Sequence, residues 1–264
     1  MRTRFTILGC GSSGGVPRLG GHWGACDPAN PKNARRRCSL LIERIDGEAV
    51  TRVLVDTSPD MRAQLLDAGV GELHGVVWTH AHADHVHGLD DLRMIVFNRR
   101  EMLDVWADEA TFASLETRFG YAFETPPGSS YPPILRRHPL SGPVRIDGPA
   151  GPVEIEPLPV SHGDIDALGL RIGALCYMPD VKDIPDAVLP RLAGLDVWIL
   201  DSLRRNVHPS HLSLPEALGW FERMAPARGV LTNLHVDLDH AAVEAETGDH
   251  VSVAYDGMVI ELAA

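Results

Sequence analysis

Three histidines and an aspartate stand within six residues of this chain, directly after an apolar run. The segment is Thr79-His80-Ala81-His82-Ala83-Asp84-His85, and it follows an expected strand over Gly75–Thr79. Side chains crowded in this way repel one another or lose hydration unless a cation binds them. Neutral imidazole nitrogens and a carboxylate suit a divalent metal. The segment therefore predicts a metal site, with a cluster of surface histidines as the alternative.

The spacing within this segment indicates two ions rather than one. In an extended stretch, side chains two residues apart point the same way, so His80 and His82 should face a common ion. Asp84 and His85 could then face a second ion beside the first. Two ions about 3.5–4 Å apart can share a hydroxide, lower its pKa and hold a scissile group. This arrangement is typical of hydrolysis.

Length and charge limit the kind of protein that can carry this site. The 264 residues, 44% of them hydrophobic, suffice for a large core, and we expect one domain over residues 1–264 because no linker is evident. The formal net charge of −12 argues against general nucleic-acid binding, since phosphate backbones attract basic surfaces. No apolar run of about 18 residues and no leader-like N-terminus is present, so we expect no membrane association.

The cysteines favour a reducing compartment. Cys10, Cys26, Cys38 and Cys176 are widely scattered along a long chain. Disulfide frameworks belong mainly to small secreted domains. We therefore expect reduced thiols and a cytoplasmic location.

Strand-like segments alternate with single helices in both halves, which predicts an α/β fold with two sheets face to face and helices outside. Helices are expected from Ser58-Pro59, over Leu89–Phe97 and from Ser213, where Glu216 completes a capping box. A long mobile loop is expected over Glu124–Pro133. The expected strands are Phe5–Leu8, Leu40–Glu43, Arg52–Val55, Gly75–Thr79, Val153–Leu158, Leu168–Ile172, Leu175–Met178, Val197–Leu200, Gly229–Leu231, Val251–Ala254 and Met258–Leu262.

The His-x-His-x-Asp-His segment resembles that of the metallo-β-lactamase superfamily, and the resemblance extends over nearly the whole chain. It implies the αβ/βα sandwich of two mixed β-sheets. It also implies that Asp56, at the end of an expected strand, orients ligands without binding metal. His162, Asp180 and His235 match the remaining ligands, although each taken singly could equally be a capping or core residue.

The resemblance implies how these ligands are shared between two divalent ions. One ion would be held by three histidines, the other by a carboxylate and two histidines, and Asp180 would bridge them. The sets are His80, His82 and His162 for the first ion, and Asp84, His85 and His235 for the second. Mixed nitrogen and oxygen ligands suit zinc, manganese or iron, and the sequence does not choose among them.

Two further segments favour a phosphodiester as substrate. The glycine-rich run Gly9–Gly15 looks like the first loop of the phosphodiesterase branch. In the tRNA 3′-processing and cyclic-phosphodiesterase branches, a histidine before a late helix assists the leaving group. His211 fits that position better than His208, and its alternative is a plain polar residue before a helix. Asp201 could orient a ligand or cap a loop.

Within that branch, the chain looks most like the phosphoribosyl cyclic phosphodiesterase of phosphonate breakdown and its PhnP-like relatives. The segments that carry this likeness are Gly14–Arg18 and Asn33–Ser39. The implied substrate is a small cyclic or nucleotide-like phosphodiester. Arg35-Arg36-Arg37 could bind its phosphate, but a solvated charged face is the more common interpretation. The family's extra structural zinc is expected to be absent, because Leu238 replaces its histidine.

Other functions remain open. The first loop also resembles the accessory proteins of pyrroloquinoline-quinone synthesis, so a carrier role in cofactor biosynthesis is one alternative. A thiolester or lactone hydrolase with the same metals is another, and a homodimer is compatible with the sequence. The pattern Gly9-x-Gly11-x-x-Gly14 matches a dinucleotide fingerprint, but no helix follows it.

The remaining histidines and the tryptophans are assigned no chemistry. We interpret the isolated histidines as surface or ligand-supporting groups; they are His74, His87, His138, His240 and His250. We interpret the tryptophans as core residues; they are Trp23, Trp78, Trp106, Trp198 and Trp220.

Overall fold

The computed structural model describes residues 1–263 and contains two seven-stranded mixed sheets. The strand order of the first sheet is β14 (Met258–Ala263), β1 (Arg2–Gly9), β2 (Ser39–Asp46), β3 (Ala49–Val55), β4 (Gly75–Val77), β5 (Leu103–Ala107), β6 (Leu135–Pro139). That of the second is β13 (Val251–Val253), β12 (Arg228–Thr232), β11 (Val197–Asp201), β10 (Leu175–Met178), β9 (Ile165–Ile172), β8 (Val153–His162), β7 (Val144–Ile146).

The chain forms two compact units. The first contains Met1–Leu8, Ser39–Glu154 and the residues from Val259 onward. The second contains Gly9–Cys38 and Ile155–Met258. The expectation of one domain over residues 1–264 stays a prediction.

In the first unit, strand direction determines where functional side chains emerge. Strands β2 and β3 form an antiparallel hairpin, whereas β3, β4, β5 and β6 run parallel. The carboxyl ends of parallel strands lie at one edge of a sheet, which is where α/β proteins place their sites. Asp56 follows β3 directly, and Thr79 and His80 follow β4.

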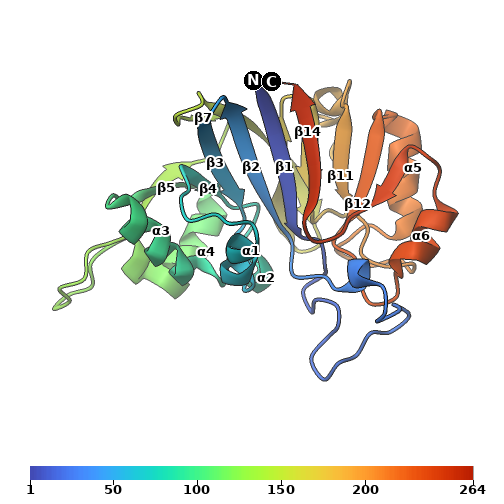
Figure 1. Cartoon of the computed structure of the whole chain (residues 1–264), viewed down its shortest axis with the longest axis horizontal. Coiled ribbons are helices and arrows are strands. Elements are labelled where there is room, and N and C mark those ends of the chain that lie inside the picture. The colour runs from blue at the N-terminus through green and yellow to red at the C-terminus, as the bar shows by residue number, and fades with distance from the viewer. Residues whose placement is uncertain (264) are drawn as a thin grey trace. The chain divides into compact units, whose positions relative to one another are not determined.

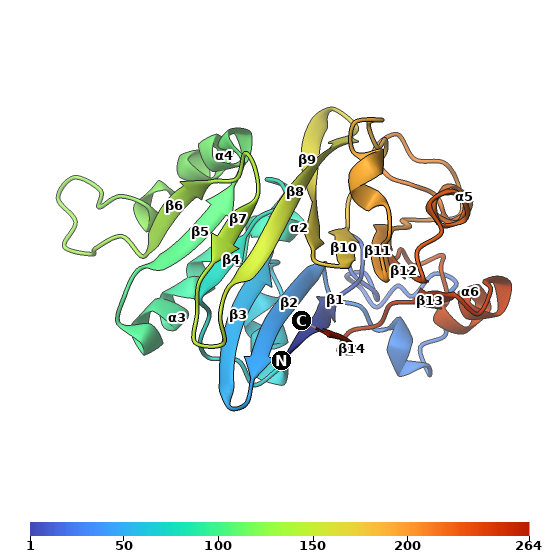
Figure 2. The same ribbon diagram turned by 90° about the horizontal axis from the view of Figure 1, so that it is seen from above.

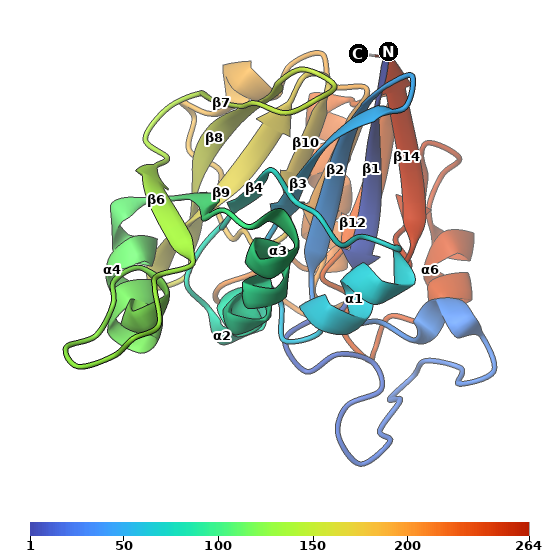
Figure 3. The ribbon, with the colours of Figure 1, turned by 60° about the vertical axis from the view of Figure 1, so that its left-hand side comes forward.

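Helices of the first unit cover one face of its sheet, as Figures 1 and 3 show. They are α1 (Met61–Asp67), α2 (Ala83–Val86), α3 (Leu92–Arg99) and α4 (Glu109–Phe119). Buried strand residues such as Leu54, Val76 and Val105 share one hydrophobic cluster with helix residues such as Met61 and Phe112. The one-turn helix α2, which carries part of the histidine segment, is thereby held against a packed core.

In the second unit, β10, β11, β12 and β13 run parallel, and β8, β9 and β10 run antiparallel (Figure 2). Its helices are α5 (Leu214–Met224) and α6 (His240–Glu246). The rings of Trp198 on β11 and Phe221 on α5 meet edge to face at 5.8 Å between centroids. A Cβ on Gly229 would lie 2.6 Å from the Phe221 ring, so glycine allows α5 to pack closely on β12. Short 3₁₀ turns occur at Pro31–Asn33, Leu89–Asp91, Gly120–Ala122 and Leu189–Leu192.

Every strand expected from the sequence is present, with shifts of a few residues at the ends. The helix expected from Ser58-Pro59 begins only at Met61, because Ser58 Oγ is bonded to Gln64 and to the amide of Asp60. The capping box of Ser213 and Glu216 is confirmed. Residues 124–134 contain no helix or strand, as expected.

Strands β5, β6 and β7 and helices α2, α4 and α6 were not expected from the sequence. Helix α4 has a local signal that would have located it, since the Asp108 side chain accepts a hydrogen bond from the amide of Thr111 at 2.7 Å. Among the helices of residues 1–263, none combines the length and apolar character that crossing a bilayer requires.

Candidate metal centre

Asp56 organises the histidine segment of the first unit. This residue has a left-handed backbone conformation (φ 63°), and its carboxylate is fully buried. It accepts hydrogen bonds from the Thr79 amide at 2.8 Å, the Thr79 hydroxyl at 2.9 Å and His85 Nδ1 at 2.7 Å. Burial raises the pKa of the Asp56 carboxyl, and the contact with His85 opposes that rise. Asp56 therefore fixes the His85 ring with its Nε2 on the opposite side.

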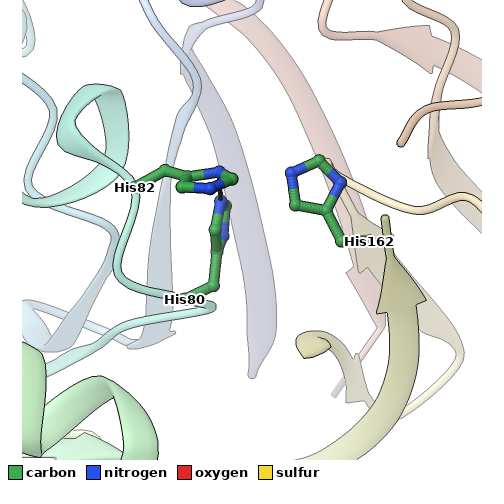
Figure 4. Close-up of side chains that lie close together, drawn as sticks. All are labelled: His80, His82 and His162. Atoms are coloured by element: carbon green, nitrogen blue, oxygen red, sulfur yellow. Dashed lines mark hydrogen bonds between the residues drawn. The ribbon is translucent and has the colours of Figure 1, made fainter. Parts of the chain in front are cut away.

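The four predicted ligands of this segment lie together. His80 Nδ1 is 3.0 Å from the Thr79 hydroxyl, and its Nε2 is 3.0 Å from His82 Nδ1 (Figure 4). The rings of His80 and His85 are 4.3 Å apart, and Asp84 Oδ2 is 3.6 Å from His85 Nε2. The expectation that His80 and His82 face the same way agrees with this geometry.

The second unit contributes a separate group of ligands. His162 ends β8 (Figure 4), Asp180 follows β10, and His211 precedes α5. Their ligand atoms all lie within 4.8 Å of one another, a spacing that could hold a metal ion. Asp180 Oδ1 is 3.8 Å from His162 Nε2 and 3.4 Å from His211 Nδ1. The backbone carbonyl of Ser210 accepts a hydrogen bond from His162 Nδ1 at 2.6 Å.

A second fully buried carboxylate, Asp201, supports this group. Its Oδ2 accepts from His211 Nδ1 at 2.8 Å and from the Val181 amide at 3.1 Å. Its Oδ1 accepts from the Asn233 side chain at 3.1 Å. Burial raises the pKa of the Asp201 carboxyl, while the His211 ring lowers it. Asp201 thus orients His211, as Asp56 orients His85 in the first unit.

His235, the last predicted ligand, follows β12. It is not part of the group formed by His162, Asp180 and His211 in the described residues. Its Nδ1 lies 2.8 Å from Asp237 Oδ1, and its Nε2 contacts the guanidinium of Arg18.

The donor chemistry of both units fits divalent metal. Histidines that bind metals usually donate one ring N–H to a carboxylate or carbonyl and coordinate through the other nitrogen. His85 and His162 each have Nδ1 against such an acceptor, an orientation in which Nε2 would be the coordinating atom. His235 has the same Nδ1 contact, and its Nε2 meets the Arg18 guanidinium. Carboxylates of Asp84 and Asp180 lie beside the first two of these rings. The side chains therefore match what a metal site requires.

Several supporting residues were not found from the sequence. Asn233 donates hydrogen bonds to both Asp180 and Asp201. Ser210 holds the ring of His162, and Asp237 holds the ring of His235. Arg118 on α4 donates to the carbonyl of Ala81, inside the histidine segment, at 2.5 Å. None of these residues belongs to the motif that located the site.

Some interpretations of charged residues need correction. The Arg35–Arg37 run is not a solvated face, because Arg35 is only 2% exposed and bonds to Asn33, and Arg36 pairs with Asp256 at 3.0 Å. His240 is buried, which excludes the surface alternative and leaves its interpretation as a ligand-supporting group a prediction.

Among the tryptophans, Trp78 and Trp198 are buried core residues, whereas Trp23, Trp106 and Trp220 are partly exposed. All four cysteines are buried, and none forms a disulfide within residues 1–263.

Comparison with known proteins identifies the family of this chain. A family model described as "Beta-lactamase superfamily domain" matches residues 51–233. A solved diphosphatase of the PhnP family has 32% sequence identity and a TM-score of 0.87, covering 99% of this chain and 98% of that one. A coenzyme PQQ synthesis protein B from Methylobacterium sp. (strain 4-46) is 30% identical over 74% of this chain and 71% of its own length.

A third relative is an octanoyltransferase from Porphyromonas gingivalis, 35% identical over 97% of this chain. The chain spans only 51% of that protein's length.

Parallel strands that end in histidines and aspartates, together with these matches, define a metal-binding hydrolase fold. The chain belongs to the metallo-β-lactamase superfamily and has its αβ/βα sandwich fold. Within the superfamily it lies in the PhnP-like branch.

Proposed function

We propose that this protein is a dinuclear metal-dependent phosphodiesterase that cleaves a small cyclic or nucleotide-like phosphodiester. The ligand groups of the two units would act on one pair of divalent ions, zinc or manganese. Family membership supports this pairing. The proposed sets are His80, His82 and His162 for one ion, and Asp84, His85 and His235 for the other, with Asp180 shared.

When bound, such ions would supply Lewis acidity and a hydroxide near neutral pH. The residues of the chain do the positioning. Asp56 and Asp237 hold the rings of His85 and His235, so that neither has to reorganise during turnover. Asp84, beside His85, would orient the attacking group as well as bind metal.

The observation that carries the proposal is the contact between His211 and Asp201. A buried carboxylate 2.8 Å from Nδ1 keeps a proton on that nitrogen and stabilises the imidazolium. Protonated His211 can then pass its Nε2 proton to the departing ester oxygen as the P–O bond breaks. General acid catalysis of this kind contributes roughly 10²–10⁴-fold.

The test is hydrolysis by the wild-type protein loaded with Zn²⁺, Mn²⁺, Co²⁺ or Ni²⁺. Substrates should include bis(p-nitrophenyl) phosphate and a set of 2′,3′- and 1,2-cyclic phosphates. We expect hydrolysis of at least one diester that stops on chelation and returns with metal. Inactivity toward every diester with every metal would overturn the proposal.

Two alternatives have their own support. The name of the octanoyltransferase relative favours testing thiolesters, although the chain spans only about half of that protein. The PQQ synthesis relatives favour a carrier that binds a product without hydrolysis. A small panel of thiolesters and lactones distinguishes the first alternative, and inactivity on all esters favours the second.

We also propose a cytoplasmic location, supported by four buried cysteines without disulfides in residues 1–263. A small-molecule substrate, rather than general nucleic-acid binding, is supported by the net charge of −12. The presence of a homodimer can be measured by light scattering.

A further inference from the structure

Arg18 lies against the last predicted metal ligand, within the second unit. Its guanidinium contacts Nε2 of His235, while Asp237 holds Nδ1 of the same ring. A guanidinium is permanently charged, only donates hydrogen bonds, and matches the oxygens of a phosphate group. Any anion bound beside His235 would therefore meet this cation.

The loop that carries Arg18 forms a tight turn at this residue. The Arg18 amide donates to the His22 carbonyl at 2.9 Å, and the Arg18 carbonyl accepts from the amides of Gly21 and His22, which closes a tight turn. The side chain crosses the loop at Gly14, where a Cβ would lie 3.3 Å from Arg18 Nε. Glycine at that position leaves room for the guanidinium.

Buried Arg35 fixes this loop relative to His235. Val16 and Arg35 exchange two backbone hydrogen bonds, at 2.9 and 2.8 Å, two residues before Arg18. The Arg35 guanidinium also donates to the His235 carbonyl at 3.5 Å. One buried side chain thus connects the loop to the predicted ligand, so the position of Arg18 is built into the unit.

Arg18 has no salt-bridge partner among the described residues. Over residues 1–263, Arg18 forms no ion pair with a carboxylate, whereas Arg36 pairs with Asp256 and Arg205 pairs with Glu246. A cation that is held in place and lacks a salt-bridge partner favours an anionic ligand over a neutral one.

We infer that Arg18 binds the non-bridging oxygens of the substrate's phosphate group and makes the site selective for phosphate esters over neutral esters. This inference rests on the proposed function. It adds a specificity-determining residue on the glycine-rich loop, outside the predicted ligand set.

The first test measures binding of inorganic phosphate to the Mn²⁺-loaded protein by calorimetry, in wild type, Arg18→Ala and Arg18→Lys. Arg223→Ala is the charge-matched control, because Arg223 is exposed and its guanidinium lies over Trp220. We expect phosphate to bind about 10- to 100-fold more weakly to Arg18→Ala, with partial recovery in Arg18→Lys and no change in Arg223→Ala.

Equal phosphate affinity in wild type and Arg18→Ala would overturn the inference, and so would an absence of phosphate binding to the wild type. Loss of bound metal from Arg18→Ala would also overturn it, since Arg18 would then support the centre instead of the substrate.

The second test compares bis(p-nitrophenyl) phosphate with the neutral ester p-nitrophenyl acetate. Arg18→Ala should raise KM for the phosphodiester and leave acetate hydrolysis unchanged. Equal loss with both esters contradicts selectivity. If the wild type hydrolyses no phosphodiester, the proposed function fails, while the phosphate titration still decides the role of Arg18.

Discussion

His211 Nδ1 lies 2.8 Å from Oδ2 of Asp201, a carboxylate with no solvent exposure. The same histidine is 3.4 Å from Asp180 Oδ1, within reach of a metal ion shared with His162. Two roles therefore compete for His211: proton donor or metal ligand.

Replacing His211 by alanine separates these roles. If His211 is a proton donor, kcat for a phosphodiester should fall roughly 10²–10⁴-fold while the metal content stays unchanged. Elemental analysis beside the kinetics provides the measurement. His208→Ala is the matched control. The His208 ring lies 5.1 Å from the His211 ring, and within residues 1–263 it forms no hydrogen bond with Asp201. Metal lost together with activity would assign His211 as a ligand.

Asp56→Asn should weaken metal binding. The amide cannot accept hydrogen bonds from both Thr79 and His85 as the carboxylate does, so the His85 ring loses its fixed orientation. Loss of such a supporting contact typically costs 10–100-fold in metal affinity. Competition with a fluorescent chelator measures this affinity, and Asp46→Asn, at the exposed end of β2, should behave as wild type. An unchanged affinity would show that Asp56 does not control the ligand.

Metal should stabilise the folded protein. A ligand that binds only the native state adds about 2.7 kcal/mol when present at 100 times its Kd. Tm should therefore rise with added Mn²⁺ or Zn²⁺ and fall when a chelator removes the ion. Differential scanning calorimetry checks this, with Mg²⁺ as the comparison ion. If none of these ions changes Tm, that result would contradict a metal centre.

Glu216 should make stability depend on acidic pH. Partial burial raises the pKa of this carboxyl, but hydrogen bonds from Lys182 and Ser213 outweigh that and hold it below its usual value. The stabilisation is therefore present above the unfolded-state pKa and is lost as pH falls through the lower folded-state pKa.

Glu216→Gln should accordingly cost up to about 1 kcal/mol at neutral pH, because the ion pair with Lys182 and the negative charge at the N-terminus of α5 are lost. The difference from wild type should shrink below about pH 4, as urea titrations at several pH values would show. A difference that stays constant with pH would mean that the charge of Glu216 is irrelevant.

Gly88→Ala should be strongly destabilising. A Cβ at Gly88 would lie 2.1 Å from the Ser58 carbonyl oxygen, so the turn after α2 would have to move away from α1. Overpacking of this kind costs about 1–3 kcal/mol. Gly142→Ala is the control, because nothing lies within 4 Å of its added Cβ. Denaturant midpoints compare the two variants.

Much of the fold was visible in the sequence because its strands are short apolar runs bounded by glycine or polar turns. Histidines and aspartates at the ends of those runs also identified the candidate ligands. Helix α4 was not evident from the sequence, because one capping residue, Asp108, is a weak signal beside the mixed composition of the segment.

The supporting contacts could not be predicted, since they join segments far apart in the chain. Asn233 reaches Asp201 across 32 residues, and Arg35 bonds to the carbonyl of His235 across 200. From local composition alone, a run of three arginines is expected to be exposed to solvent. Contacts with distant residues nevertheless bury the first of the three, Arg35. Whether Asp201 orients a ligand or caps a loop was equally open from the sequence, and its contact with His211 favours the former.

The first and last strands of the described chain are neighbours, with β14 beside β1 and Arg4 bonded to Glu261 at 2.9 Å (Figure 1). During translation, β1 leaves the ribosome before β14. The edge of β1 that pairs with β14 therefore stays exposed until more than two hundred further residues have been made. Chaperone binding to nascent chains should be most persistent at this edge.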